Sequence, residues 1–401
     1  MISERIKRAL EGSSAIRAMF VEGKELAERV GAENVYDFSL GNPATPAPAS
    51  LAEAVQELTA QSTATAEGSA QLHGYMDNAG YPQVRAAVAE NLNRRFGTSF
   101  DFHNITMTVG AAGGLNIIFQ TILNPGDEVI VFAPFFGEYR EYAANFGAGI
   151  VAVQPDRETF QPDLEDFAVR ITEKTKALIV NTPNNPTGVV YSPETMRKIA
   201  AVLEEKQREF MHDIYLISDE PYRELVYDGG REDFLTKYYR NTLVGYSFSK
   251  SLSLPGERIG YVVVPDEAAQ AGELIQGLAI ANRTLGFVNA PSLMQRAVAR
   301  VLEEKTDLAF YDQNRRMLYE GLTRLGFSCI RPQGAFYLWV KSPEEDEEAF
   351  VREGKKLHIL MVKGSAFGCP GYVRLAYCVS HEMIARSLPA FEKLAGHYGL
   401  G

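Results

Sequence analysis

The sequence predicts an α/β fold in which a mostly parallel sheet is covered by helices on both faces. The first observation is a series of short β-branched runs, each closed by turn residues. The second is that helical stretches separate several of these runs, as the crossover connections of parallel strands require. The third is a strand, polar turn and strand at 242–264. The runs before it are 105–109, 128–134, 149–155, 177–183 and 214–221.

The first hundred residues predict helices and loops that precede this sheet. Apolar residues recur at helical spacing over Glu4–Val30, which predicts an amphipathic helix or arm. Gly41 and three prolines break the pattern over Phe38–Pro48. Helical spacing resumes over 51–60, a glycine-rich loop is expected over 71–83, and a helix is expected over 84–96.

A smaller α+β domain is expected after the alternation of strands and helices fades near Gln295. The sequence there predicts a helix over 295–325 and strands over 334–340 and 372–378. The acidic run that begins at Pro343 is expected to be a solvated surface. We therefore expect an N-terminal arm over 1–45, a large domain over 46–294 and a small C-terminal domain over 295–401.

Composition restricts the function. The formal charge of −11 over 401 residues argues against sequence-independent nucleic-acid binding, although a few local arginines suffice for a small anion. No apolar run approaches the ~18 residues of a membrane span, and the N-terminus lacks the apolar core of a signal peptide. Cys329, Cys369 and Cys378 are too few for a disulfide framework and are expected to be free thiols. A cytoplasmic protein without a metal site is expected.

Lys250 is the strongest candidate for covalent chemistry. It lies in the polar turn with Ser247 and Ser249, just after the first strand predicted within 242–264, where the sheet ends and a ligand crevice opens. A desolvated lysine is more often neutral and nucleophilic, and a nearby cation such as Arg258 favours the same form. The hydroxyl of Ser247 and the guanidinium of Arg258 suit a phosphate ester. A lysine that captures an aldehyde beside a phosphate suggests pyridoxal phosphate, although many turns of this composition are only solvated loops.

Other strand ends carry the groups that this cofactor requires. Asp219 follows strand 214–218 and is placed to keep the ring nitrogen protonated, although an aspartate there also caps turns. Tyr222 and Asn185 each have a donor for the ring oxygen, but the first is also a usual core residue and the second a usual turn residue. Phe136 follows strand 128–134 and could stack on the ring, with Phe135 as the competing choice.

Phosphate and carboxylate binding have separate candidates. Gly110, Ala111 and Ala112 open a strand-to-helix turn whose backbone N–H groups suit a phosphate. The turn matches neither a dinucleotide-binding nor a P-loop motif, which disfavours those ligands. Arg374 lies inside an apolar strand, where an arginine is costly unless paired, and its planar fork suits a substrate α-carboxylate.

The ordered motifs NNPTG (184–188), SDEPY (218–222), SFSKSLSLPGERIGY (247–261) and VRLAY (373–377) resemble those of the class I/II aminotransferases of the aspartate aminotransferase family, which have pyridoxal-phosphate fold type I. FSLGNP, HGYMDNAGYPQ, PQGAFYLWV and GSAFG are also similar, so the resemblance covers nearly the whole chain. It implies a ping-pong transfer of an amino group between an L-amino acid and a 2-oxo acid. Lys250 would form the internal aldimine and shuttle the proton.

The resemblance also implies roles for individual residues. It places Asp219 at the ring nitrogen, Asn185 and Tyr222 at the ring oxygen, and Arg374 and the backbone of Gly41 at the substrate carboxylate. The phosphate would be held by Ser247, Ser249, Arg258 and the turn at 110–112, in which Ala111 and Ala112 leave only backbone donors. Tyr75 would reach the phosphate in a neighbouring subunit, so a homodimer with shared active sites is implied.

Two alternatives stay open at this stage. A pyridoxal-phosphate-dependent carbon–sulfur β-lyase or related eliminating enzyme would share most of the cofactor residues. A ligand-sensing or protein-binding module built on the same fold is the other. The preferred side chain of the substrate is not predicted, because Arg17, Arg283 and Arg331, the candidates for a second carboxylate, lie in segments that the sequence does not place.

Overall fold

The computed structural model describes residues 2–11, 15–230 and 233–400 of the chain. It confirms the α/β class. A sheet of seven strands has the order β2-β8-β7-β6-β5-β3-β4, and β8 runs opposite to the other six strands. The strands are β2 (Ile105–Thr108), β3 (Glu128–Phe132), β4 (Gly149–Val153), β5 (Thr175–Val180), β6 (Tyr215–Asp219), β7 (Thr242–Ser247) and β8 (Gly260–Val263).

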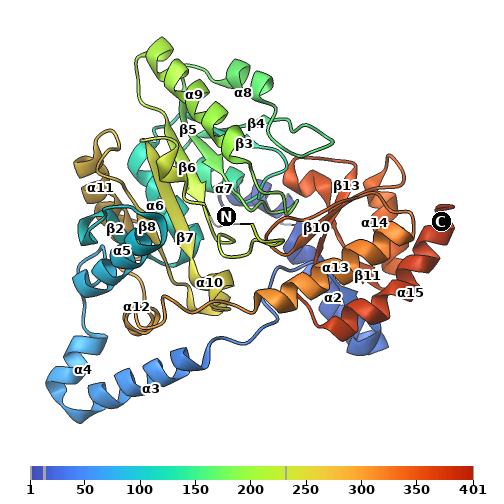
Figure 1. Ribbon diagram of the computed structural model, residues 1–401, viewed down its shortest axis with the longest axis horizontal. Coiled ribbons are helices and arrows are strands. Elements are labelled where there is room, and N and C mark those ends of the chain that lie inside the picture. Colours follow the sequence, from blue (N-terminus) through green and yellow to red (C-terminus); the bar gives the residue numbers. More distant parts are fainter. Residues whose placement is uncertain (1, 12–14, 231–232, 401) are drawn as a thin grey trace.

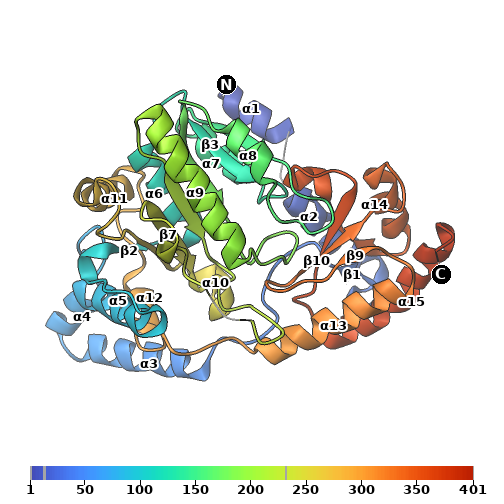
Figure 2. The same ribbon diagram turned by 45° about the horizontal axis from the view of Figure 1, so that its top comes forward.

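Helices cover both faces of this sheet (Figures 1 and 2). Alternate residues of one strand point to opposite faces, so Val129 and Val131 pack with one layer of helices while Ile130 and Phe132 pack with the other. The first layer contains α6 (Gly110–Ile122), α7 (Tyr139–Ala144) and α11 (Ala271–Thr284). The second contains α8 (Leu164–Arg170) and α9 (Pro193–Phe210).

A third group of helices packs at the β2–β8 end of the sheet and extends outward at the lower left of Figure 1. It consists of α3 (Ala49–Ala64), α4 (Ala66–His73), α5 (Pro82–Phe96) and α12 (Ser292–Val298). A glycine-rich loop was expected from 71, but residues 71–73 are the last turn of α4. Thr65 caps the start of this helix by accepting from the Gly68 N–H.

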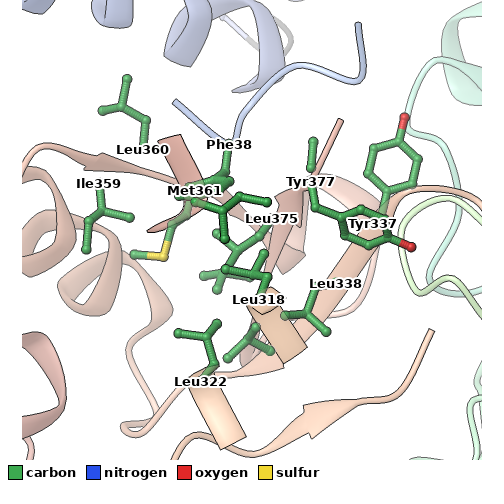
Figure 3. Close-up of a cluster of buried hydrophobic side chains, with 14 of the residues drawn as sticks. Phe38, Leu318, Leu322, Tyr337, Leu338, Ile359, Leu360, Met361, Leu375 and Tyr377 are labelled. Atoms are coloured by element: carbon green, nitrogen blue, oxygen red, sulfur yellow. The ribbon is translucent and has the colours of Figure 1, made fainter. Parts of the chain in front are cut away.

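The C-terminal part forms a smaller α+β body around a four-stranded sheet of order β12-β13-β10-β9. Figure 3 shows its core, in which Phe38 packs among side chains from far later in the chain, including Leu318 and Leu375. Its elements are α13 (Leu308–Arg324), β9 (Cys329–Ile330), β10 (Tyr337–Lys341), α14 (Glu347–Lys356), β11 (Ile359–Leu360), β12 (Val362–Lys363), β13 (Tyr372–Ala376) and α15 (His381–His397).

The N-terminal segment joins the small body through a β-pair. Strand β1 (Tyr36–Asp37) pairs in parallel with β11, and Met19 and Leu26 of α2 (Ala15–Val30) belong to the same core as Phe38. The expected single helix over 4–30 is described as α1 (Glu4–Glu11) and α2, while 12–14 lie outside the described residues.

The helix expected over 295–325 is wrong as a single element. Helix α12 ends at Val298 and α13 begins at Leu308, where Asp307 accepts from the Phe310 N–H as a cap. Buried Val298 and Val301 pack with α3 and α5, whereas Tyr311 packs in the small body, so the chain crosses between two cores here. The division at 295 stays a prediction.

The acidic run is also less solvated than expected. Asp346 caps α14, and the carboxylate of Glu347 is buried and accepts from the backbone N–H groups of Ser365, Gly371 and Tyr372. No helix in the described part of the chain is long and apolar enough to cross a membrane.

Candidate active site

The candidate site is a cavity of about 260 Å³ at the carboxyl ends of the parallel strands, where the large and small bodies meet. It is lined by Leu40, Gly41, Ala111, Ala112, Leu115, Phe136, Tyr139, Tyr142, Asn181, Asn185, Asp219, Pro221, Tyr222, Ser247, Ser249, Lys250, Pro255, Arg258, Tyr337 and Arg374. Most of the sequence-predicted residues therefore come together; Gly110 directly precedes the lining residue Ala111, and Tyr75 lies outside the cavity of its own chain.

Lys250 lies in the short helix α10 (Phe248–Ser251), which directly follows β7. Its Nζ donates to the Gly41 carbonyl oxygen over 2.5 Å. Burial lowers the pKa of the Lys250 amine to about 8, and Arg374 and Arg258 also lower it, against the opposite effect of Cys378. At neutral pH roughly a tenth of such amines are neutral, compared with about one in 10³ for an ordinary lysine. The amine is therefore suited to nucleophilic attack.

Asp219 ends β6 and is buried. Its Oδ2 accepts from the Tyr139 hydroxyl over 2.5 Å, while its Oδ1 has no partner among the described residues. Burial raises the pKa of the Asp219 carboxyl to about 6, although the bond from Tyr139 lowers it. A buried carboxylate oxygen without a donor is costly unless a cation or N–H group meets it. A protonated ring nitrogen satisfies this requirement.

Asn181 fixes the loop that follows β5. Its Nδ2 donates to the Asp219 carbonyl over 2.9 Å, and its Oδ1 accepts from the Asn185 N–H over 2.8 Å. The same loop contacts the small body, because the N–H groups of Gln333 and Gly334 donate to the Gly188 carbonyl. The turn at 184–188 therefore holds Asn185 against both bodies.

Arg374 is buried in β13, and no carboxylate of the described residues forms an ion pair with it. Its Nη1 donates to Asn185 Oδ1 over 2.9 Å and its Nη2 donates to the Ser39 carbonyl over 2.5 Å, while its Nε has no partner. Burial lowers the pKa of the Arg374 guanidinium, because the charge is poorly solvated. A carboxylate ligand would restore its charge balance.

Three features converge on the side of the cavity that suits a phosphate. The N-terminus of α6 presents its free backbone N–H groups at Ala111 and Ala112. Arg258 lies against Gly110, whose φ of +76° lets the turn approach closely; a Cβ there would lie 2.7 Å from Arg258 Nη2. Ser247 Oγ donates to Ser249 Oγ over 2.7 Å at the start of α10. Helix dipole and guanidinium both favour an anion.

Phe136, not Phe135, lines the cavity; Phe135 is buried against Arg140 and donates through its backbone to Phe367. The second-carboxylate candidates do not join the site. Arg283 is exposed on α11, and Arg331 is exposed and paired with Asp228. The side chain of Arg17 lies outside the described residues.

Tyr139, Asn181 and Tyr337 are site residues that sequence reasoning missed. Asn181 directly follows β5, and Tyr139 begins α7 after the loop that follows β3, so a polar side chain near a strand end was the available signal for both. Tyr337 had no such signal, because it lies in β10 beside Leu338, Trp339 and Val340, which are buried core residues. Its hydroxyl lies 2.8 Å from that of Tyr222.

A family model described as "Aminotransferase class I and II" matches residues 33–391. The chain belongs to this family. The aspartate/prephenate aminotransferase of Thermus thermophilus is 33% identical over 398 residues, which cover 98% of this chain and 99% of that one. An aminotransferase structure from Eubacterium rectale is 48% identical, covers 99% of both chains and has a TM-score of 0.94. An aspartate aminotransferase structure from Thermus thermophilus, with maleate, is 30% identical with a TM-score of 0.86 and covers 98% and 99%.

These findings confirm the resemblance, the fold type and the class of enzyme. The chain is an aminotransferase, and the carbon–sulfur lyase that the motifs left open is not favoured.

Proposed function

We propose that this aminotransferase binds pyridoxal 5'-phosphate in the described cavity and transfers an amino group between an L-amino acid and a 2-oxo acid. The observation that carries the proposal is the buried Asp219, whose Oδ1 lacks a donor in the same cavity that holds a lysine of lowered pKa. When bound, this cofactor supplies an aldehyde that amines attack and a ring that withdraws electrons from the substrate α-carbon.

The chain supplies binding, orientation and proton transfer. Asp219 Oδ1 would accept from the ring nitrogen, Asn185 and Tyr222 would meet the ring oxygen, and Phe136 would stack on the ring. The N–H groups of the turn at 110–112, Ser247, Ser249 and Arg258 would hold the phosphate. The unpaired Oδ1 of Asp219 and the position of the other side chains in the cavity lining support these roles.

Substrate binding is assigned to Arg374, whose fork is held in place by Asn185 and the Ser39 carbonyl. The backbone of Gly41 lies beside it at the cavity wall and anchors the Lys250 amine. Lys250 Nζ then takes the proton from the substrate α-carbon and returns it as general base and acid. The lowered pKa keeps both protonation states accessible near neutral pH.

Further parts of the proposal concern the assembly and the cell. We propose a homodimer in which Tyr75, 96% exposed in its own chain, contacts the cofactor phosphate of the partner subunit. We also propose a cytoplasmic location, since Cys329, Cys369 and Cys378 are free thiols.

The test is to reconstitute the protein with pyridoxal phosphate, reduce it with borohydride and map the adduct by mass spectrometry. The expected adduct is on Lys250. Lys250→Ala should lose it and at least about 10³-fold of the turnover, because the variant has neither the nucleophile nor the base. Lys198→Ala, which removes an exposed lysine of α9, should retain both.

An adduct that forms elsewhere, or turnover that survives in Lys250→Ala, would contradict the proposal. Two relatives above are named for aspartate, so L-aspartate with 2-oxoglutarate is the first pair to assay. Other amino acids should then be tested one by one as amino donors. The readout is the change in the visible absorbance of the bound cofactor when it accepts the amino group.

A further inference from the structure

Tyr337 connects the cofactor side of the cavity to its substrate side. Its side chain is 2% exposed and contacts the cavity. Its hydroxyl lies 2.8 Å from the Tyr222 hydroxyl, and the two rings meet edge to face at 5.6 Å. The guanidinium carbon of Arg374 lies 4.5 Å from the centre of the Tyr337 ring. One side chain thus touches the residues proposed for the ring oxygen and for the substrate carboxylate.

Close packing fixes the position of the Tyr337 hydroxyl. A Cβ on Gly41 would lie 2.1 Å from the Tyr337 oxygen, so only glycine at position 41 leaves room for it. The carbonyl of the same Gly41 accepts from Lys250 Nζ. Phe336 packs beside Tyr337, with ring centres 5.1 Å apart, and lies 5.5 Å from Lys250 Nζ. The ring of Tyr337 has therefore little freedom to move.

The number of hydrogen bonds that each direction allows indicates whether the Tyr337 or the Tyr222 hydroxyl is the donor. Tyr222 is the hydrogen-bond partner that the structure gives to the Tyr337 hydroxyl within the described residues. If Tyr337 donates to Tyr222, the Tyr222 proton stays available for a ring oxygen in the cavity, and both protons are used. If Tyr222 donates instead, the ring oxygen loses the Tyr222 donor and the Tyr337 proton has no acceptor, which is costly at a buried site.

We propose that Tyr337 is a positioning residue that donates to Tyr222 and thereby directs the Tyr222 proton to the cofactor ring oxygen. The inference rests on the proposed function and adds a residue to it. A hydroxyl that accepts one hydrogen bond donates a stronger one, because the chain of bonds polarises cooperatively. Tyr337 therefore acts through Tyr222 and not on the cofactor itself.

The proposal predicts a spectroscopic effect. The bound cofactor would have a visible absorbance that titrates, and its deprotonated form would carry more negative charge on the ring oxygen. A hydrogen-bond donor at that oxygen would stabilise this charge and lower the apparent pKa of the titration. Loss of the Tyr337 hydroxyl should weaken the donor and raise this apparent pKa. Asp219, Arg374 and Cys378 are the other titratable or charged groups that act on the two tyrosines. They stay unchanged in the variants.

The experiment is a pH titration of the visible absorbance of the reconstituted enzyme. Tyr337→Phe should raise the apparent pKa by about half a unit, the size of one modest hydrogen bond, and Tyr222→Phe should raise it further. The double variant should titrate like Tyr222→Phe alone, because Tyr337 acts only through Tyr222. Tyr215→Phe removes another buried tyrosine hydroxyl, at the opposite end of β6, and should titrate like the wild type.

The outcomes separate the two proposals. A fall or no change in Tyr337→Phe, or additive shifts in the double variant, would overturn the role of Tyr337. Tyr337→Leu also lacks the hydroxyl and should show the same rise, so either variant that folds by circular dichroism completes the test. A wild-type enzyme in which the borohydride adduct is not on Lys250 would instead contradict the proposed function.

Discussion

At the scale of single residues, the site is built from charged groups that burial holds away from their usual pKa. Asp219 and Lys250 lie in one cavity, with a carboxyl pKa raised to about 6 and an amine pKa lowered to about 8. Both shifts come first from desolvation, which penalises each charged form. A bound pyridinium would reverse the penalty at Asp219, because it supplies the missing positive charge.

The raised pKa of Asp219 predicts how the cofactor-free protein responds to pH. The folded state binds the carboxyl proton more tightly than the unfolded state, whose pKa is near 3.8, so folding stability falls as pH rises from about 4 to about 6. The full effect is about 3 kcal/mol. The Asp219→Asn variant lacks this pH-dependent contribution to stability, because its amide does not titrate. The difference in unfolding free energy, wild type minus variant, should therefore fall by that order across the window in urea titrations.

Asp228→Asn is the matched control for this measurement. The hydrogen bond from Arg315 lowers the pKa of the Asp228 carboxyl, so this group titrates below about pH 4. The difference in unfolding free energy, wild type minus Asp228→Asn, should therefore be flat across the window. Parallel curves for wild type and Asp219→Asn would show that the carboxyl is not desolvated.

At the scale of elements, strand ends and helix starts decide where the chemistry lies. Helix α6 starts directly after β2, so its N-terminus faces the same edge of the sheet as Asp219 and Lys250. Gly110 makes this geometry possible. Its φ of +76° is strained for other residues, and Arg258 occupies the space that a side chain would need.

Gly110→Ala should therefore weaken cofactor binding by at least about tenfold, since the strain and the displaced Arg258 both disturb the phosphate cradle. Equilibrium dialysis against pyridoxal phosphate measures this change. Gly272→Ala, in the first turn of α11 with nothing within 4 Å of the added Cβ, should bind like the wild type. If the two variants bind the cofactor with equal affinity, the turn at Gly110 is not part of the phosphate site.

At the scale of the whole molecule, the loop that follows α4 is held rigid and carries Tyr75 outward. Three hydrogen bonds tie the loop to the large body. The side chain of Asn282 donates to the Asn78 carbonyl, and that of Asn78 donates to the Val288 carbonyl. The side chain of Gln295 accepts from the Tyr81 N–H. Asn282 and Gln295 are fully buried, while Tyr75 is 96% exposed. An ordered loop that presents an exposed aromatic side chain supports the proposed contact with a partner subunit.

Mixed dimers test this contact. Tyr75→Ala and Lys250→Ala should each have low activity as pure proteins. In random mixtures of the two, half of the dimers should be hybrids with one intact site, so activity should recover to about a quarter of the wild-type value. Sedimentation velocity checks that the mixture is dimeric. If the mixture is dimeric and activity does not recover, Tyr75 does not contribute to the active site of the partner subunit.

Local patterns in the sequence determined the sheet and most of the site. Strands β5, β6 and β7 are short apolar runs that end at or just before a polar residue, and parallel strands must bring those ends to one edge. Asp219, Asn185 and Lys250 could therefore be grouped before any coordinates. An arginine inside an apolar strand had already indicated Arg374, and motif resemblance then added Tyr75, whose position no local pattern explains.

Only the tertiary structure decided the contacts between segments that are distant in the chain. Tyr337 is indistinguishable in sequence from a core residue, and it meets Tyr222 only because β10 of the small body packs against the loop after β6. The bond of Tyr139 to Asp219 and the break between α12 and α13 also depend on which core each segment joins. Spacing along the chain specifies secondary structure and strand ends, whereas burial and unpaired polar atoms arise only when separate elements pack together.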